Sequence, residues 1–240
     1  MRRAVLWMII AAHLAAACSH LPELHPETHE DPAAHRPEPL SACRAVFPPR
    51  PVQMVHSIDA KFPGGRQSGL VGVTVVFPAE RRIHCVLMTV EGVVLFSARY
   101  DGTLSVEHAV SPFDRKGFGE GLMADLVLIF LAPGDPFELQ GRYADGDWGC
   151  RYRARTGEVT DVRPGAGETW SIRRYTSTSR LSRSVDASGV PADASEGVSY
   201  AYPRQMMLTG SGPGGYVLSL TLIEAHPVER SPGAARSGSK

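Results

Sequence analysis

The chain has 240 residues, 43% of them hydrophobic, and its 25 Lys and Arg residues balance 25 Asp and Glu residues, so the formal net charge is zero. This composition is typical of a water-soluble globular protein with enough apolar residues for one domain of medium size. A zero net charge argues against a nucleic-acid-binding protein with a broad basic surface, and a charged fraction of 21% is too low for a wholly disordered chain.

The N-terminus has the pattern of a secretory signal. Arg2 and Arg3 precede an apolar run, residues 4–14, and small residues then end directly at Cys18. A charged start, a short apolar segment and small residues before the cleavage site are the three parts of such a signal. The apolar run is shorter than the roughly 20 residues that span a bilayer. We therefore predict a signal peptide over residues 1–17.

Cys18 is similar in its position to the lipidated cysteine of bacterial lipoproteins. This resemblance implies a lipid anchor at Cys18, including palmitate-type acyl chains, and more than one acyl chain would hold the protein firmly to a membrane. Ser19 follows, and by the sorting rule of Gram-negative lipoproteins it implies transfer to the outer membrane, facing the periplasm. The alternative is an ordinary cleaved signal with Cys18 as a spare thiol.

Three further cysteines, Cys43, Cys85 and Cys150, follow the proposed anchor. A secreted protein lies in an oxidising compartment, where a disulfide is allowed. Because the number is odd, at most one pair can form within the chain, and the spacing does not select which pair.

Residues 19–51 are rich in Pro and lack apolar periodicity. Pro at high density favours an extended, semi-rigid spacer, so we predict that residues 18–51 are a tether between anchor and domain. Four histidines in the same stretch raise the alternative of a metal-binding tract: His20, His25, His29 and His35. Their irregular spacing favours a solvated tether, and no metal site is predicted.

From Val52 onward the sequence has the alternation of apolar and polar residues that is typical of β-strands. Strands are predicted over residues 68–77, 82–90, 93–100 and 103–110. Asp101-Gly102 is a strong signal for a two-residue hairpin turn, so these strands indicate an antiparallel meander.

The C-terminal half is predicted to add four more strands. They cover residues 148–155, 168–176, 200–209 and 215–224. Between them, residues 177–196 are rich in Ser, Arg, Asp and Ala, which favours a flexible excursion. The small, polar segment 227–240 is predicted to be a disordered tail.

One helix is predicted over residues 117–132, where apolar residues recur at helical spacing and Pro133 ends the run. Its second half is apolar on nearly every side, so it is either a core helix or a helix in an apolar trough. If it lies in a trough, five side chains are candidates to line an apolar ligand site: Leu122, Met123, Leu126, Val127 and Phe130.

The sequence offers no catalytic constellation. Residues 210–215 formally fit G-x-G-x-x-G, but a strand-like run follows instead of a helix, which favours a hairpin turn. There is no G-x-S-x-G, H-E-x-x-H, C-x-x-C or phosphate-loop Lys. Arg151, Arg153 and Arg155 alternate on one strand and are predicted to form a solvated face, with contact to anionic lipid headgroups as the alternative. We expect no enzymatic activity and no cofactor.

Three stretches resemble a known family: residues 86–102 (VLMTVEGVVLFSARYDG), 121–126 (GLMADL) and 214–220 (GGYVLSL). Together with a lipid-anchor signal and a Pro-rich spacer they are similar to an uncharacterised branch of LolB-like outer-membrane lipoproteins, in the LolA/LolB lipoprotein-carrier superfamily. The resemblance covers residues 52–226. It implies an α+β fold, with a strongly curved antiparallel sheet that forms an open half-barrel and helices packed on its concave face.

These observations lead to one hypothesis and one alternative. The hypothesis is a non-enzymatic, membrane-anchored lipoprotein that binds a lipid or other acyl compound in an apolar cavity at the outer membrane. The alternative is an envelope assembly or scaffold lipoprotein whose core is filled and which takes no ligand. The membrane, through Cys18, and an acyl ligand are the partners expected. The sequence predicts no nucleic-acid partner and identifies no protein partner.

Overall fold

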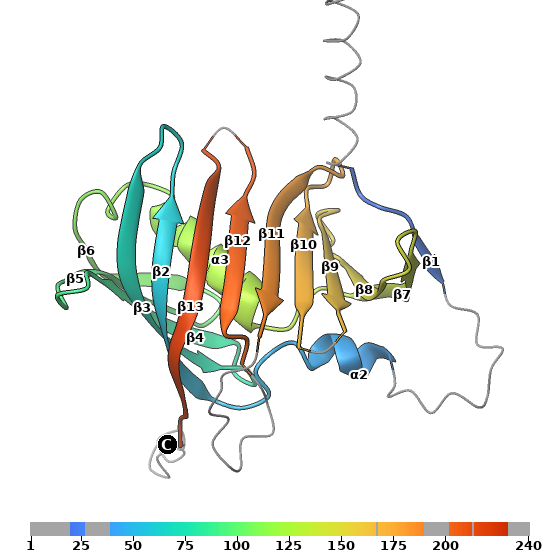
Figure 1. Ribbon diagram of the computed structural model, residues 1–240, viewed down its shortest axis with the longest axis horizontal. Coiled ribbons are helices and arrows are strands. Elements are labelled where there is room, and N and C mark those ends of the chain that lie inside the picture. The colour runs from blue at the N-terminus through green and yellow to red at the C-terminus, as the bar shows by residue number, and fades with distance from the viewer. Residues whose placement is uncertain (1–19, 27–38, 167, 190–201, 213, 230–240) are drawn as a thin grey trace, which may run out of the picture.

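The computed structural model describes residues 20–26, 39–166, 168–189, 202–212 and 214–229 (Figure 1). These residues form one antiparallel sheet of 13 strands, together with the helices α2 and α3. Within them, no helix is both long and apolar enough to cross a membrane. The predicted signal peptide, Cys18 and most of the predicted tail 227–240 lie outside the described residues.

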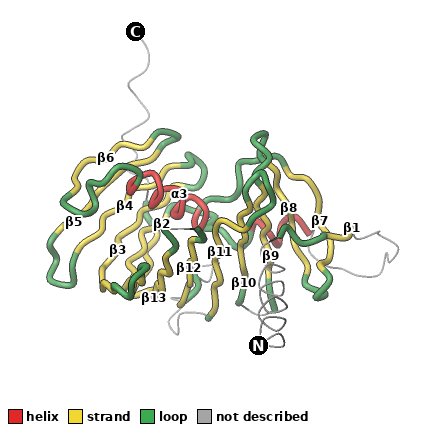
Figure 2. Tube along the Cα trace, turned by 90° about the horizontal axis from the view of Figure 1, so that it is seen from above, coloured by secondary structure: helices red, strands yellow, loops and turns green. Residues whose placement is uncertain are grey.

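The strands follow one another along the sheet in the order β1-β7-β8-β9-β10-β11-β12-β13-β2-β3-β4-β5-β6. Their bounds are β1 Leu24–Pro26, β2 Val52–Lys61, β3 Gln67–Phe77, β4 Arg82–Met88, β5 Val94–Tyr100, β6 Leu104–Ala109, β7 Phe137–Tyr143, β8 Trp148–Arg153, β9 Val159–Pro164, β10 Trp170–Tyr175, β11 Leu181–Ser188, β12 Gln205–Gly210 and β13 Tyr216–Pro227. The helices are α2 Pro39–Arg44 and α3 Phe118–Phe130. Because β1 and β6 are the two edges, the sheet is open and not a closed barrel, and Figure 2 shows its bent course.

One face of the sheet carries the core. In β2 the residues at every second position from Val52 to Ala60 are buried, and the residues between them are partly exposed up to Ile58. Side chains directly opposite in neighbouring strands share a face, so the register continues this apolar layer from strand to strand. In the other half of the sheet the layer runs through the paired residues Val162, Ile172 and Val185, each with an exposed fraction of 0%.

Both helices contact this same face. On α3, the Asp125 carboxylate accepts hydrogen bonds from Arg183 of β11 and Tyr216 of β13. Arg183 lies two residues before Val185 and therefore points to the face that carries the core. The helix α2 is joined by a disulfide to Cys150, which is paired with Val162 in that same layer. The core of the described residues is consequently one continuous cluster.

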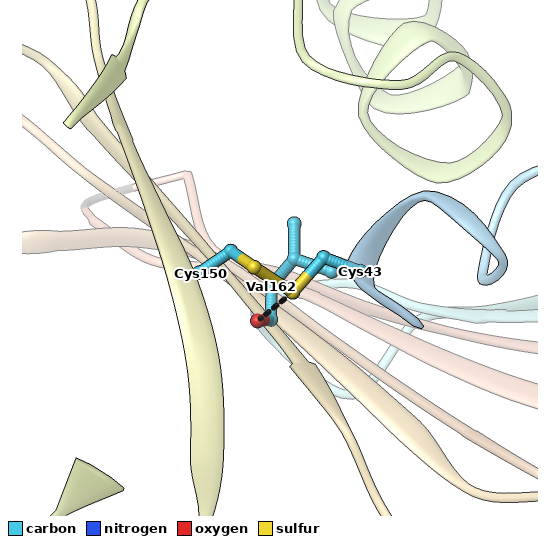
Figure 3. The surroundings of a disulfide bond; sticks show 3 residues. All are labelled: Cys43, Cys150 and Val162. Atoms are coloured by element: carbon cyan, nitrogen blue, oxygen red, sulfur yellow. Dashed lines mark hydrogen bonds between the residues drawn. A yellow bond between two sulfur atoms is a disulfide. The ribbon is translucent and has the colours of Figure 1, made fainter. Parts of the chain in front are cut away.

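The disulfide pairs Cys43 of α2 with Cys150 of β8, whose Cα atoms are 6.2 Å apart (Figure 3). Both residues are fully buried, and Cys43 Sγ lies 3.6 Å from the carbonyl oxygen of Val162. Cys85 is left as a buried free thiol, and burial raises its pKa to about 11. Of the three pairs that the sequence left open, the structure therefore selects one.

Two parts of the range predicted as a tether, residues 18–51, lie against the sheet instead of in solvent. Residues 24–26 form β1, which pairs with β7, and Leu24 is only 6% exposed. The helix α2 is held by the disulfide at Cys43. The remaining residues 27–38 lie outside the described part of the chain.

The prediction of a flexible excursion over residues 177–196 is wrong for its first half, because β11 occupies Leu181–Ser188. Within β11 only Val185 and Ala187 are buried. The other positions are polar or small and partly exposed, so the apolar alternation is too sparse to indicate a strand. The strands β7 and β9 were not predicted either, whereas β3 to β6 and α3 agree with the sequence within a few residues.

Candidate functional site

The helix α3 begins and ends as the sequence indicates. Gly117 precedes it with a φ of 86°, a left-handed conformation that glycine adopts without strain. Glu120 in the first turn is favourable for the helix dipole. At the other end Leu131 is extended, its N–H donates to the carbonyl of Val127, and Pro133 prevents a further turn.

An apolar cavity of about 230 Å³ lies between the N-terminal half of α3 and the core face of the sheet. Its sheet side is lined by apolar residues of β2, β3, β4 and β13: Ile58, Ala60, Leu70, Leu87 and Leu218. Phe62 lies at the cavity and is 40% exposed. The cavity is an open hollow and not a sealed void, so a ligand could reach it without unfolding of the core.

The helix side of the cavity contains unfilled space at Gly121. A Cβ atom built there has no heavy atom within 4 Å, apart from its neighbours in the helix. Glycine inside a helix is less favourable than alanine by about 1 kcal/mol. The missing side chain therefore lowers helix stability and leaves room for a ligand beside Leu122, which lines the same cavity.

The wall of the cavity carries one polar cluster, formed by Asp125, Arg183 and Tyr216. Arg183 Nε donates to Asp125 Oδ1, and the Tyr216 hydroxyl donates to Asp125 Oδ2. Burial raises the pKa of the Asp125 carboxyl, while the hydrogen bond from Tyr216 and the charge of Arg183 act in the opposite direction. Burial, with the charge of Asp125, also raises the pKa of Tyr216, which keeps its hydroxyl a donor. The cluster joins α3 to β11 and β13.

The five helix residues that the sequence singled out do not all line this cavity. Leu122 does, whereas Met123 and Val127 line a second hollow on the other side of α3. Leu126 and Phe130 are 8% and 4% exposed and belong to the packed core. The reason is the helical rotation of about 100° per residue, which turns positions 123 and 127 away from 122.

The second hollow, of about 410 Å³, is less suited to an acyl chain. It is lined by the charged side chains of Arg81, Glu120, Asp135 and Arg174 in addition to apolar residues of α3. Arg81 Nη1 also donates to the carbonyl of Ala132 at 2.8 Å, just beyond the end of α3. Burying a chain there would remove water from several charges, which is unfavourable.

The predicted solvated face of Arg151, Arg153 and Arg155 is wrong for Arg151. That side chain is buried, and its Nε and Nη2 donate to the two carboxylate oxygens of Asp161, each at 2.7 Å. Arg153 pairs with Glu138 nearer the surface, and Arg155 is exposed. The face is covered at Arg151 by the N-terminal segment, whose Pro22 carbonyl accepts a further hydrogen bond at 2.8 Å.

Sequence reasoning missed Arg183, Tyr216 and Gly121 as parts of the site. Arg183 and Tyr216 are separated from Asp125 by 58 and 91 residues, so no local pattern connects them. Of the cluster, Asp125 alone gave a signal, because it is the one charge of the helix after Glu120. Among the described residues, no group of three or more His, Cys, Asp or Glu side chains is placed to hold a metal ion.

No protein-family model and no curated protein matches the chain. Among solved structures, it resembles the crystal structure of a LolA superfamily protein from Nitrosomonas europaea. That likeness covers 82% of this chain and 96% of the other, with 13% sequence identity and a TM-score of 0.43. A likeness this loose does not assign the chain to a family.

Proposed function

We propose that the protein is a non-enzymatic lipoprotein that binds a lipid or other acyl compound in the apolar cavity between α3 and the sheet. In this proposal Cys18 carries the lipid anchor, the protein is held at the outer membrane, and α3 occupies the concave side of the bent sheet. The resemblance of its residues to LolB-like lipoproteins motivates the proposal, and the geometry of the cavity supports it independently.

The observation that carries the proposal is the apolar cavity beside Gly121. Its lining is apolar except for the cluster at Asp125, and a small number of polar groups in an apolar pocket is the usual form of a small-molecule site. An unbranched chain would contact Leu122 and Leu218 and gain about 0.8 kcal/mol for each buried CH₂. The polar end of the ligand would then lie near Arg183 or at the opening.

The size of the cavity restricts the ligand. Its volume of about 230 Å³ is below the roughly 300–1,000 Å³ of pockets for drug-sized molecules. A short acyl compound fits this space, and a longer chain would leave part of its length outside the cavity. The scaffold alternative requires instead that the cavity takes no ligand at all.

The test uses two helix variants that add the same side chain on different sides of α3. Gly121→Leu fills the cavity, and Ala124→Leu is the matched control because Ala124 lines the other hollow. Excluding two CH₂ groups of a bound chain removes about 1.6 kcal/mol, which is more than a tenfold loss of affinity. We expect Gly121→Leu to lose binding of a fluorescent fatty-acid probe to that extent, while the control binds as the parent does.

The result separates the two hypotheses. Equal binding by the parent and Gly121→Leu would place the probe elsewhere and contradict the proposal. No binding by the parent would favour the scaffold protein with a filled core. Thermal unfolding of each variant shows that a loss of binding comes from a folded protein.

A further inference from the structure

The first described residues after Cys18 are held to one end of the sheet. His20 forms a β-bridge with Arg180, and the N–H of Leu21 donates to the carbonyl of Ser179 at 3.0 Å. Both partners belong to the turn between β10 and β11. The chain then continues through Pro22, whose carbonyl is bound by Arg151, and into β1.

This attachment fixes the distance between a lipid anchor and the sheet. Only Ser19 separates Cys18 from His20. An extended chain spans about 3.3–3.6 Å per residue, so two residues span roughly 7 Å. A lipid on Cys18 would therefore hold the turn between β10 and β11 close to the bilayer surface, because only one residue intervenes.

The same end of the sheet holds the apolar cavity. Every neighbouring pair is antiparallel, so β2, β10 and β12 run in one direction, and their following turns, residues 62–66, 176–180 and, apart from Pro213, 211–215, lie at one end (Figure 1). Phe62 begins the first of these turns, and Tyr216 directly follows the last. Both side chains line the cavity.

The composition of these three turns suits a lipid surface. Phe62 is 40% exposed, and Arg66 and Arg180 are the charged residues of these three turns. The turns after β4 and β8, residues 89–93 and 154–158, lie at the same end and contain Glu91, Arg155 and Glu158. An aromatic ring and cations favour the headgroup region of a bilayer that contains anionic lipids. Of the turns at the opposite end, residues 78–81 contain Glu80 beside Arg81, and residues 165–169 contain Glu168.

We infer that the end of the sheet formed by the turns 62–66, 176–180 and 211–215 lies against the bilayer, with the cavity opening toward it. This inference rests on the lipid anchor of the proposed function. The partner of this surface is the same membrane in which the lipid anchor is inserted. An acyl chain then passes between bilayer and cavity at Phe62 with little exposure to water.

The test measures depth in vesicles with the full-length lipidated protein. Phe62→Trp reports from the proposed membrane end, and Ala79→Trp, an exposed position in the turn between β3 and β4, is the matched control at the other end. The protein is reconstituted in vesicles of phosphatidylethanolamine and phosphatidylglycerol that contain a brominated lipid, and floated vesicles are collected. We expect quenching of Trp at position 62 and no quenching at position 79, after subtraction of the parent signal.

Equal quenching of the two positions would overturn the inference. A third variant carries a Gly/Ser linker of about 12 residues, with an average span of roughly 20 Å, between Ser19 and His20. We expect this linker to abolish most of the quenching at position 62, and unchanged quenching would also overturn the inference. If the protein does not float with the vesicles, it has no lipid anchor and the proposed orientation is refuted. Fatty-acid binding in the cavity at Gly121 is measured in a separate experiment, so its result does not depend on this one.

Discussion

Removal of the Asp161 carboxylate should destabilise the protein strongly. The Arg151 and Asp161 side chains are 7% and 0% exposed, and two hydrogen bonds of 2.7 Å join them. Asp161→Ala would leave the guanidinium of Arg151 buried without a carboxylate, with a hydrogen bond to the Pro22 carbonyl. Breaking a buried ion pair in this way lowers the free energy of unfolding by about 3–5 kcal/mol.

Replacing both members of the pair should be far less harmful than removing one. Arg151→Met combined with Asp161→Leu leaves no buried charge, and apolar replacement of a whole buried pair is often close to neutral. We expect the double variant to be more stable than Asp161→Ala alone. Urea unfolding of the parent, the single variants and the double variant, with the disulfide intact, gives the four free energies of a double-mutant cycle.

The reasoning depends on the exclusion of water from the pair by the N-terminal segment. A loss below about 1 kcal/mol for Asp161→Ala would match an exposed pair and would refute the buried geometry. It would also indicate that residues 20–26 do not stay on the sheet at Arg151, which removes the attachment on which the membrane orientation rests.

Three further predictions follow from buried groups. Replacing Cys43 and Cys150 by Ser opens a disulfide with a sequence separation of 107 residues, and we expect a loss of about 2–5 kcal/mol in urea unfolding; an unchanged midpoint would contradict the pairing. Burial lowers the pKa of His56 to about 4 from 6.5, so below pH 6.5 the unfolded chain binds the proton more readily and stability falls. The total loss as pH falls from 6.5 to about 4 is roughly 3 kcal/mol, and His56→Phe should remove this part of the pH dependence; identical pH profiles would show that the imidazole is not buried in solution. Phe130 is 4% exposed and its ring contacts His56. Phe130→Ala should therefore lower the free energy of unfolding by about 3–5 kcal/mol, and a decrease below about 1 kcal/mol would indicate that α3 is not packed on the core.

The strands that the sequence predicted are those with a dense apolar alternation and clear turns. In β3, apolar residues at every second position from Val71 to Phe77 indicated the strand, although the buried positions are the intervening ones from Leu70 to Val76. Asp101-Gly102 marks the turn that follows β5. By contrast, β11 buries only Val185 and Ala187. Its position in the sheet depends on its pairing with β10 and β12, and the pattern of apolar residues along the sequence does not reveal this pairing.

The site could be predicted only in part, because its polar cluster is assembled across the fold. The periodicity of α3 predicted an apolar helix face that includes Leu122, and Leu122 lies at the cavity. Leu122 and Leu126 are four residues apart and share a face of the helix, so the same periodicity could not show that Leu122 lines the cavity while Leu126 is packed in the core. Likewise, the alternation of arginines on β8 could not show that Asp161 and Pro22 enclose Arg151.

Native mass spectrometry of the chain from Ser19 onward, prepared without detergent, tests the central claim most directly. We predict that the parent protein carries the added mass of an acyl compound, and that Gly121→Leu, with its cavity filled, does not. The Ala124→Leu control should retain the added mass. An unmodified mass for the parent after incubation with a fatty acid, or the same added mass on Gly121→Leu, would contradict the proposal that this cavity holds an acyl chain.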